Sequence, residues 1–333
     1  MAAATSPRPG TGLVQLTRRG ALSALGLPVV GSLSGCLGSG WQSTGATTFT
    51  IATGNPGGVF SRYGEALSTV LTRHLDGLTA TARPTDASVE NILLVASGEC
   101  DLGFSLGDTA SDAVRGTGAF EQPEDVVTLA RTYDSFTHLV VRADSGFSSV
   151  ADLRHHRVGL GAPGSGTRVI ARRILRQSGL ALTDVEVASE SLEDSAEALR
   201  AGDLAAFFFV SGLPNEAVLS LNADDPIRLV ELDGLVDSMV RAYGPEYVRG
   251  PIPASTYGLS EGVETVSVKN YLVASPAMSE DLAYAVTRVI FEAQKEIERL
   301  APGVRQPALG AAIFTSPLDL HRGAVRYFRE RRP

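Results

Sequence analysis

From residue 49 to residue 210, short apolar runs typical of strands alternate with stretches of helical period. Strands that alternate with helices predict an α/β protein in which mostly parallel sheets are covered by helices on both faces. The expected strands are 49–53, 78–81, 102–105, 138–142, 157–160, 185–188 and 205–210, and the expected helices are 61–74, 88–97, one near Thr109, 168–178, 195–201 and an amphipathic 281–300.

Two of these strand–helix steps pass through glycine-rich loops, at residues 54–58 (GNPGG) and 161–167 (GAPGSGT). The N–H groups of the helix start that follows such a loop are unpaired, and the helix dipole adds partial positive charge there. Each loop is therefore a candidate anion site. The repeat of the unit at 49–74 and 157–178 predicts two similar lobes that face a common cleft.

The second loop also matches other phosphate motifs. Residues 159–164 fit G-x-G-x-x-G and Asp184 lies 20 residues further on, as in a dinucleotide fingerprint, but Pro163 and the small residues after it start the helix too late. A nucleotide phosphate loop needs lysine where Thr167 stands. Residues 103–107 (GFSLG) fit G-x-S-x-G, so an exported serine hydrolase that uses Ser105 stays an alternative.

The chain begins with features of an export signal. Arg18 and Arg19 precede a weakly apolar run at 21–30, which is too short to span a bilayer, and residues 33–36 (LSGC) resemble a lipoprotein cleavage box. We therefore expect residues 1–35 to be a twin-arginine or general secretory signal, Cys36 to be lipidated and residues 36–48 to be a flexible tether. The other cysteine, Cys100, is expected to be a small buried hydrophobe. The formal charge of −8 makes nucleic acid a poor partner.

Taken together, the motifs resemble those of TAXI-type receptors, the solute-binding components of tripartite ATP-independent periplasmic (TRAP) transporters. The resemblance covers nearly all of residues 49–330 and is carried, in order, by residues 51–64, 88–91, 97–98, 101–108, 161–167, 205–214, 252–257 and 321–324. It implies a two-lobed type II periplasmic-binding fold with a hinge between the lobes. Lobe I would contain residues 49–135 and 269–333, and lobe II residues 136–268.

The resemblance also implies a function without catalysis, cofactor or metal. The receptor would capture a small carboxylate, such as an acidic amino acid or a 2-oxo or 2-hydroxy acid, by lobe closure. It would act as a monomer, held by its lipid on the outer face of the cytoplasmic membrane, and deliver the solute to a TRAP permease. A lipoprotein that senses the ligand for a membrane kinase is the alternative within binding.

By motif position, the resemblance implies a set of ligand-binding residues: Gly57, Gly58, Phe60, Ser88, Asn91, Asp108, Tyr133, Ser165, Gly166, Thr167, Phe209 and Pro214. Phe60 stands where the family commonly has tyrosine, Ala87 replaces a glycine, and Leu106 is less polar than the usual residue. We expect from Phe60 and Leu106 a solute more apolar than glutamate.

Overall fold

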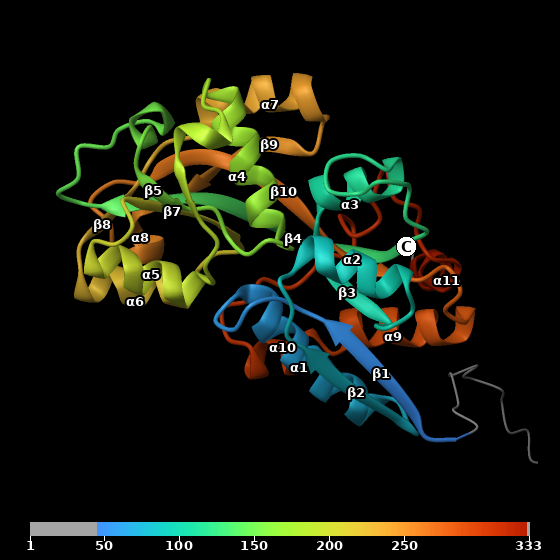
Figure 1. The fold of residues 1–333 in the computed structure, drawn as a ribbon. Helices are drawn as coiled ribbons and strands as arrows, with labels where there is room; N and C mark the ends of the chain where they lie inside the picture. The colour runs from blue at the N-terminus through green and yellow to red at the C-terminus, as the bar shows by residue number, and fades with distance from the viewer. Residues whose placement is uncertain (1–44, 332–333) are drawn as a thin grey trace, which may run out of the picture. The chain divides into compact units, whose positions relative to one another are not determined.

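A ten-stranded mixed sheet organises residues 45–331, which are the residues that this computed structural model describes (Figure 1). The strand order is β2-β1-β3-β10-β4-β7-β5-β6, with β8 paired to β4 and β9 paired to β10. The strands are β1 (Thr47–Ala52), β2 (Leu78–Arg83), β3 (Leu102–Leu106), β4 (Val127–Arg142), β5 (Arg157–Gly159), β6 (Glu186–Ala188), β7 (Ala206–Ser211), β8 (Ile227–Leu229), β9 (Tyr247–Ile252) and β10 (Val263–Ala274).

Helices follow most of the strands, as the alternating pattern predicts. They are α1 (Val59–His74), α2 (Ser88–Ala96), α3 (Gly107–Arg115), α4 (Gly166–Gln177), α5 (Leu192–Ala201), α6 (Glu216–Asp224), α7 (Val236–Tyr243), α8 (Ala254–Tyr257), α9 (Glu280–Glu292), α10 (Gln294–Leu300) and α11 (Arg322–Glu330). The expected strands and the helices up to residue 201 are confirmed within a few residues, except that β4 begins at Val127, eleven residues before the expected start at 138. The single helix expected at 281–300 is wrong, because the chain leaves helical geometry at Ala293 and forms α9 and α10 instead.

Two long strands depart from the expected parallel pattern. The pairs β1–β2, β1–β3, β5–β6 and β5–β7 are parallel, but β4 and β10 pair antiparallel with each other and with their other neighbours. Figure 1 shows both strands running from one group of strands to the other. Their register shifts at Asn270, whose buried amide donates to the carbonyl of Tyr133 at 2.9 Å and to the hydroxyl of Ser135 at 2.9 Å. The β4–β10 pair is therefore the connection between the two groups.

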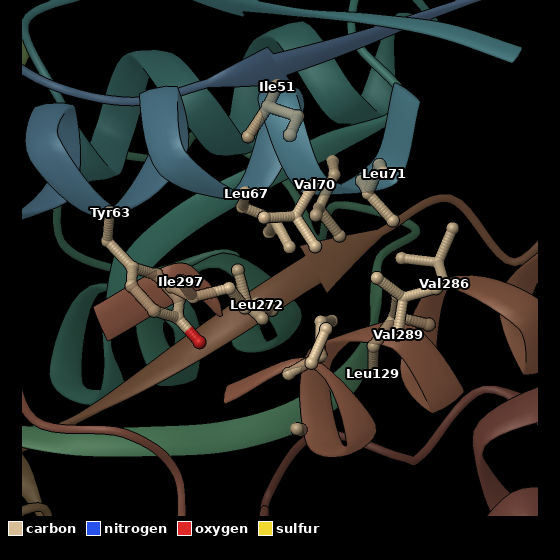
Figure 2. Close-up of a cluster of buried hydrophobic side chains, with 14 of the residues drawn as sticks. Ile51, Tyr63, Leu67, Val70, Leu71, Leu129, Leu272, Val286, Val289 and Ile297 are labelled. Atoms are coloured by element: carbon tan, nitrogen blue, oxygen red, sulfur yellow. The ribbon is translucent and has the colours of Figure 1, made fainter. Parts of the chain in front are cut away.

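The buried hydrophobic side chains also form separate clusters for the two groups of strands. One pair of clusters joins side chains of β1–β3 and α1–α3 to those of α9–α11, so the C-terminal helices complete the core begun by the N-terminal strands. Figure 2 shows this packing, where Leu67 of α1 lies over Leu272 of β10 and Leu71 lies on the side of Val286 of α9. The other clusters join β5–β9 to α4–α8. We call these groups of elements the first and the second lobe; the exact boundaries at 135/136 and 268/269 stay predictions.

The expected signal, tether and Cys36 lie outside the described residues. Within residues 45–331, none of the helices has the length and apolar character needed to cross a membrane. Cys100 is 2% exposed and unpaired, which confirms the expected buried thiol, and burial raises its pKa.

Candidate functional site

Three helices begin at the wall of one small pocket between the two lobes. Residues from the first turns of α1 and α2 line it from the first lobe, and residues from the first turn of α4 line it from the second. The pocket has a volume of about 40 Å³. Its lining consists of Gly54, Asn55, Gly58, Val59, Phe60, Ala87, Ser88, Leu106, Tyr133, Ser135, Ser165, Gly166, Thr167, Phe209, Val210, Ser211 and Gly212, all of them without formal charge. Within this lining, partial positive charge is therefore available only from the helix N-termini.

Eight of the twelve residues expected from the motifs line this pocket. They are Gly58, Phe60, Ser88, Tyr133, Ser165, Gly166, Thr167 and Phe209. The two glycine loops thus meet as the repeated strand–loop–helix unit predicts. The structure places the other four, Gly57, Asn91, Asp108 and Pro214, outside the lining; a ligand contact by any of the twelve stays a prediction.

The α4 terminus fits closely against the first lobe at Gly166. A Cβ atom at this position would lie 2.7 Å from the hydroxyl oxygen of Ser88 and 2.7 Å from a methyl carbon of Leu106. Beside it, the carbonyl of Gly164 accepts hydrogen bonds from the N–H groups of Val89 and Glu90 in the first turn of α2. The absence of a side chain at Gly166 is therefore what lets the two helix starts approach each other.

The hydroxyl groups of the pocket differ in whether the protein already uses their protons in hydrogen bonds. The hydroxyl of Ser165 donates to the carbonyl of Ala162 at 2.7 Å and accepts from the N–H of Arg168, so it caps α4. Within the described residues, the hydroxyls of Ser88 and Thr167 only accept, from the N–H groups of Leu106 and Val210 respectively. Each of those two has its proton free for a bound anion.

Asn91 lies beneath the pocket and holds the backbone in place. Its amide nitrogen donates to the carbonyls of Thr53 and Phe104, and its oxygen accepts from the hydroxyl of Thr85. The residue is fully buried. Its hydrogen-bonding groups are thereby occupied in tying the first glycine loop to β3.

Two buried hydroxyls at the pocket have no hydrogen-bond partner within the described residues, those of Tyr133 and Ser211. Burial raises the pKa of Tyr133, so it stays a protonated donor. Its ring belongs to an aromatic group with Phe60, at 6.5 Å between ring centroids, and Tyr63, at 6.3 Å. The pocket therefore offers an aromatic wall beside unused donors.

Ala87, at the start of α2, has a φ of +84°, a conformation that glycine adopts far more readily. We expect Ala87→Gly to raise the free energy of unfolding by about 1 kcal/mol, because relief of strain exceeds the added entropy of the unfolded chain. Chemical denaturation measures this. The matched control is Ala223→Gly, at an exposed position within α6, which should be destabilising. A loss of stability in Ala87→Gly as large as that of the control would contradict the strain.

His138 forms a buried relay under the second lobe's side of the pocket. Because the carbonyl of Phe209 can only accept, Nδ1 carries the proton, and Nε2 accepts from the hydroxyl of Tyr257 at 2.8 Å. The oxygen of Tyr257 in turn accepts from the N–H of Asn215. Burial lowers the pKa of His138 to about 4 from an ordinary value of 6.5. The folded protein therefore holds this imidazole neutral.

This relay predicts a dependence of stability on pH. Since the unfolded chain protonates His138 near pH 6.5 and the folded protein near pH 4, the stabilisation is complete above 6.5 and declines as pH falls toward 4. We expect wild type to lose about 2 kcal/mol between pH 7 and pH 5 from this group. Denaturation curves of wild type and His138→Gln at both pH values isolate the contribution. An equal pH dependence in the two proteins would refute it.

A buried ionic network lies across the lobes, away from the pocket lining. Arg173 of α4 contacts Asp108 at 3.2 Å and also binds Asp112, both on α3, and it donates to the hydroxyl of Tyr247 at 2.7 Å. The hydroxyl of Tyr247 donates to Asp108 at 2.7 Å. Burial raises the pKa of Asp108, and the charge of Arg173 opposes this shift. Sequence reasoning missed Arg173, Asp112 and Tyr247, because their spacing carries no local motif.

Ser105 does not have the geometry of a hydrolase nucleophile. It lies within β3, is 0% exposed and donates its hydroxyl proton to the carbonyl of Leu106 at 2.9 Å. A nucleophile elbow requires an exposed serine on the turn after the strand. The structure therefore gives the hydrolase alternative no support.

The fold is that of periplasmic binding proteins. A binding-protein component of an ABC phosphonate transporter from Pseudomonas aeruginosa has a similar structure with a TM-score of 0.54 and 12% identity, covering 79% of this chain and 80% of that one. PhnD1 from Prochlorococcus marinus, solved with methylphosphonate, matches with a TM-score of 0.52 and 15% identity over 78% of this chain and 92% of that one. These similarities show the expected two-lobed α/β fold. The model of the NMT1-like family matches residues 51–331, so the chain belongs to the NMT1-like family.

Proposed function

We propose that this protein is an extracytoplasmic receptor that captures a small organic anion, foremost a carboxylate, between its two lobes for a membrane transporter. One observation carries the proposal: helices α1, α2 and α4 begin at one pocket whose lining has no charged side chain. Several helix N-termini directed at one small space favour a negative charge. PhnD1, with a similar fold, was solved with a small phosphonate, which is also an anion.

The pocket's own groups account for recognition. The N–H groups of Gly166 and Thr167 have no partner within the described part of the chain, and they would meet the anion together with the free hydroxyl protons of Ser88 and Thr167. Phe60 and Phe209 would cover the apolar part of the solute. Such a site binds an anion through neutral donors, and the exclusion of water strengthens each hydrogen bond.

Lobe closure would retain the solute. The pocket takes donors from both lobes, so a bound anion contacts the closed form more favourably than the open form and shifts the population toward it. Contacts outside the pocket support the closed form, including the Arg62–Glu216 ion pair of 2.9 Å between α1 and α6. Binding and release complete this cycle without any chemical step.

The proposed class of transporter rests on a resemblance in the sequence motifs. Residues 161–167 and 205–214 resemble TAXI receptors, so we propose a TRAP permease as the partner, with a lipid on Cys36 holding a monomeric receptor at the membrane. A sensor kinase as the recipient is the alternative within the same binding function. Copurification with either membrane protein distinguishes the two.

The proposal is tested by identifying what the protein holds. Mass spectrometry of small molecules released from the purified, denatured protein should detect an organic anion in near-stoichiometric amount. Calorimetry with carboxylates, alkanesulfonates and phosphonates on the emptied protein should then show saturable binding of at least one class. Release of a cationic or neutral solute, with no binding of any anion, would overturn the proposal.

A further inference from the structure

A second and much larger hollow adjoins the pocket of the helix termini. This groove has a volume of about 560 Å³ and shares three lining residues with the pocket, namely Val59, Tyr133 and Gly212. Its lining combines the apolar residues Phe136, Leu213, Pro251, Pro253, Ala308 and Ala311 with the polar or charged residues Arg131, Thr132, Asp134, Thr256, Arg305 and Gln306. These three residues thus form a wall that is common to the two spaces.

The pocket alone is too small for a whole organic acid. A buried water needs about 10–15 Å³ of such volume, so the pocket of about 40 Å³ has room for only a few water-sized groups, whereas the groove of about 560 Å³ is more than ten times larger. A charged head group such as a carboxylate is of the size that the pocket admits. The rest of any solute needs an adjacent space, and the groove provides one of the size usual for organic ligands.

Packing, with no side-chain hydrogen bond among the described residues, holds Tyr133 in the shared wall. A Cβ atom at Gly212 would lie 2.8 Å from the ring of Tyr133, so only glycine there permits the present position of the ring. The hydroxyl of Tyr133 has no hydrogen-bond partner within residues 45–331. Rotation of this side chain therefore breaks no hydrogen bond and exchanges one set of aromatic contacts for another.

The far side of the groove carries polar groups. Arg305 is exposed and has no carboxylate partner within the described residues, whereas Arg131 is paired with Asp134 at 2.7 Å. The side-chain oxygen of Gln306 is buried without a partner. These groups suit the polar end of a solute whose chain has crossed the apolar part of the groove.

We infer that the solute is an elongated organic anion, whose charged head occupies the pocket of the helix termini and whose apolar chain passes Tyr133 into the groove. The inference rests on the proposed function and deepens it by naming the solute class. Tyr133 and Gly212 are then the residues that decide which chain lengths bind, because they form the passage between the head and the tail of the solute.

The test uses straight-chain carboxylates from acetate to octanoate, measured by calorimetry on the emptied protein. Wild-type affinity should rise about fourfold with each added methylene, as expected for burial of that group. Ala308→Trp, at an exposed position of the groove, should bind acetate as wild type does but lose the gain with chain length. Ala181→Trp, an exposed alanine in a different groove, is the matched control and should keep the gain.

The outcomes separate this inference from the proposed function. Binding of short and long carboxylates with equal affinity, or an unchanged chain-length gain in Ala308→Trp, would overturn the elongated solute and leave the anion receptor standing. Binding of no anion of any class would overturn the proposed function itself. If Ala308→Trp does not fold, as judged by circular dichroism, Thr256→Trp fills the same groove from α8 and is expected to give the same loss.

Discussion

Arg173→Gln is expected to lower the free energy of unfolding by about 3–5 kcal/mol, because it leaves two buried carboxylates without their positive partner. The side chain of Arg173 is 10% exposed, and those of Asp108 and Asp112 are 2% and 7% exposed. The guanidinium also lies 4.6 Å from the ring centroid of Tyr243. Urea denaturation followed by circular dichroism measures the loss.

Arg172 provides the matched control for that variant. It is the preceding residue of α4, is exposed, and has no salt bridge within the described residues. Arg172→Gln removes the same charge and should change stability by less than about 0.5 kcal/mol. Equal stabilities of the two variants would show that the network contributes nothing. Because Arg173 joins α4 to α3 across the lobes, its variant should also have a larger radius of gyration in solution scattering.

Simultaneous replacement of Ser88 by alanine and Thr167 by valine is expected to weaken anion binding by at least about 100-fold. Each hydroxyl has a free proton and lines the pocket, and a hydrogen bond to a charged group contributes about 1.5–3 kcal/mol. Calorimetry with the natural solute, once identified, measures the loss. The effect should appear in the dissociation constant while the folded structure persists.

Ser165→Ala is the control for the double variant. Its hydroxyl already donates to the carbonyl of Ala162, so its removal should cost about 1 kcal/mol of stability as a lost helix cap and change binding far less. Binding that depends as strongly on Ser165 as on the Ser88–Thr167 pair would mean that an anion does not meet the hydroxyls as proposed. Anion binding that survives in the double variant would equally show that the anion does not contact these hydroxyls.

Local patterns predicted the parts of the fold that local chemistry determines. The strands and helices up to residue 201 follow from apolar period and glycine placement, and both glycine loops reach one pocket as expected. The antiparallel β4–β10 pair was not predicted, since its pairing joins residues more than a hundred positions apart. β10 (Val263–Ala274) also carries Ser267, Lys269 and Asn270 among its apolar residues, which weakens the strand signal.

Local patterns predicted only part of the candidate site. Motif positions identified residues that line the pocket, such as Phe60, Gly166 and Phe209. They could not distinguish Asn91, whose amide is occupied beneath the pocket, from Ser88, whose proton is free. That distinction depends on hydrogen bonds between distant segments. The adjoining groove depends in addition on the segment at 305–311, which carries no motif of its own.

We propose that the N-terminus of α4 and the Ser88 hydroxyl at the start of α2 together hold the charged group of an anionic solute. A crystal structure of the protein with its natural solute bound tests this most directly. We expect the anionic group to lie within hydrogen-bond distance of the N–H groups of Gly166 and Thr167 and of the Ser88 hydroxyl. A solute whose charged group lies elsewhere, or whose group at the helix termini is neutral or cationic, would contradict it.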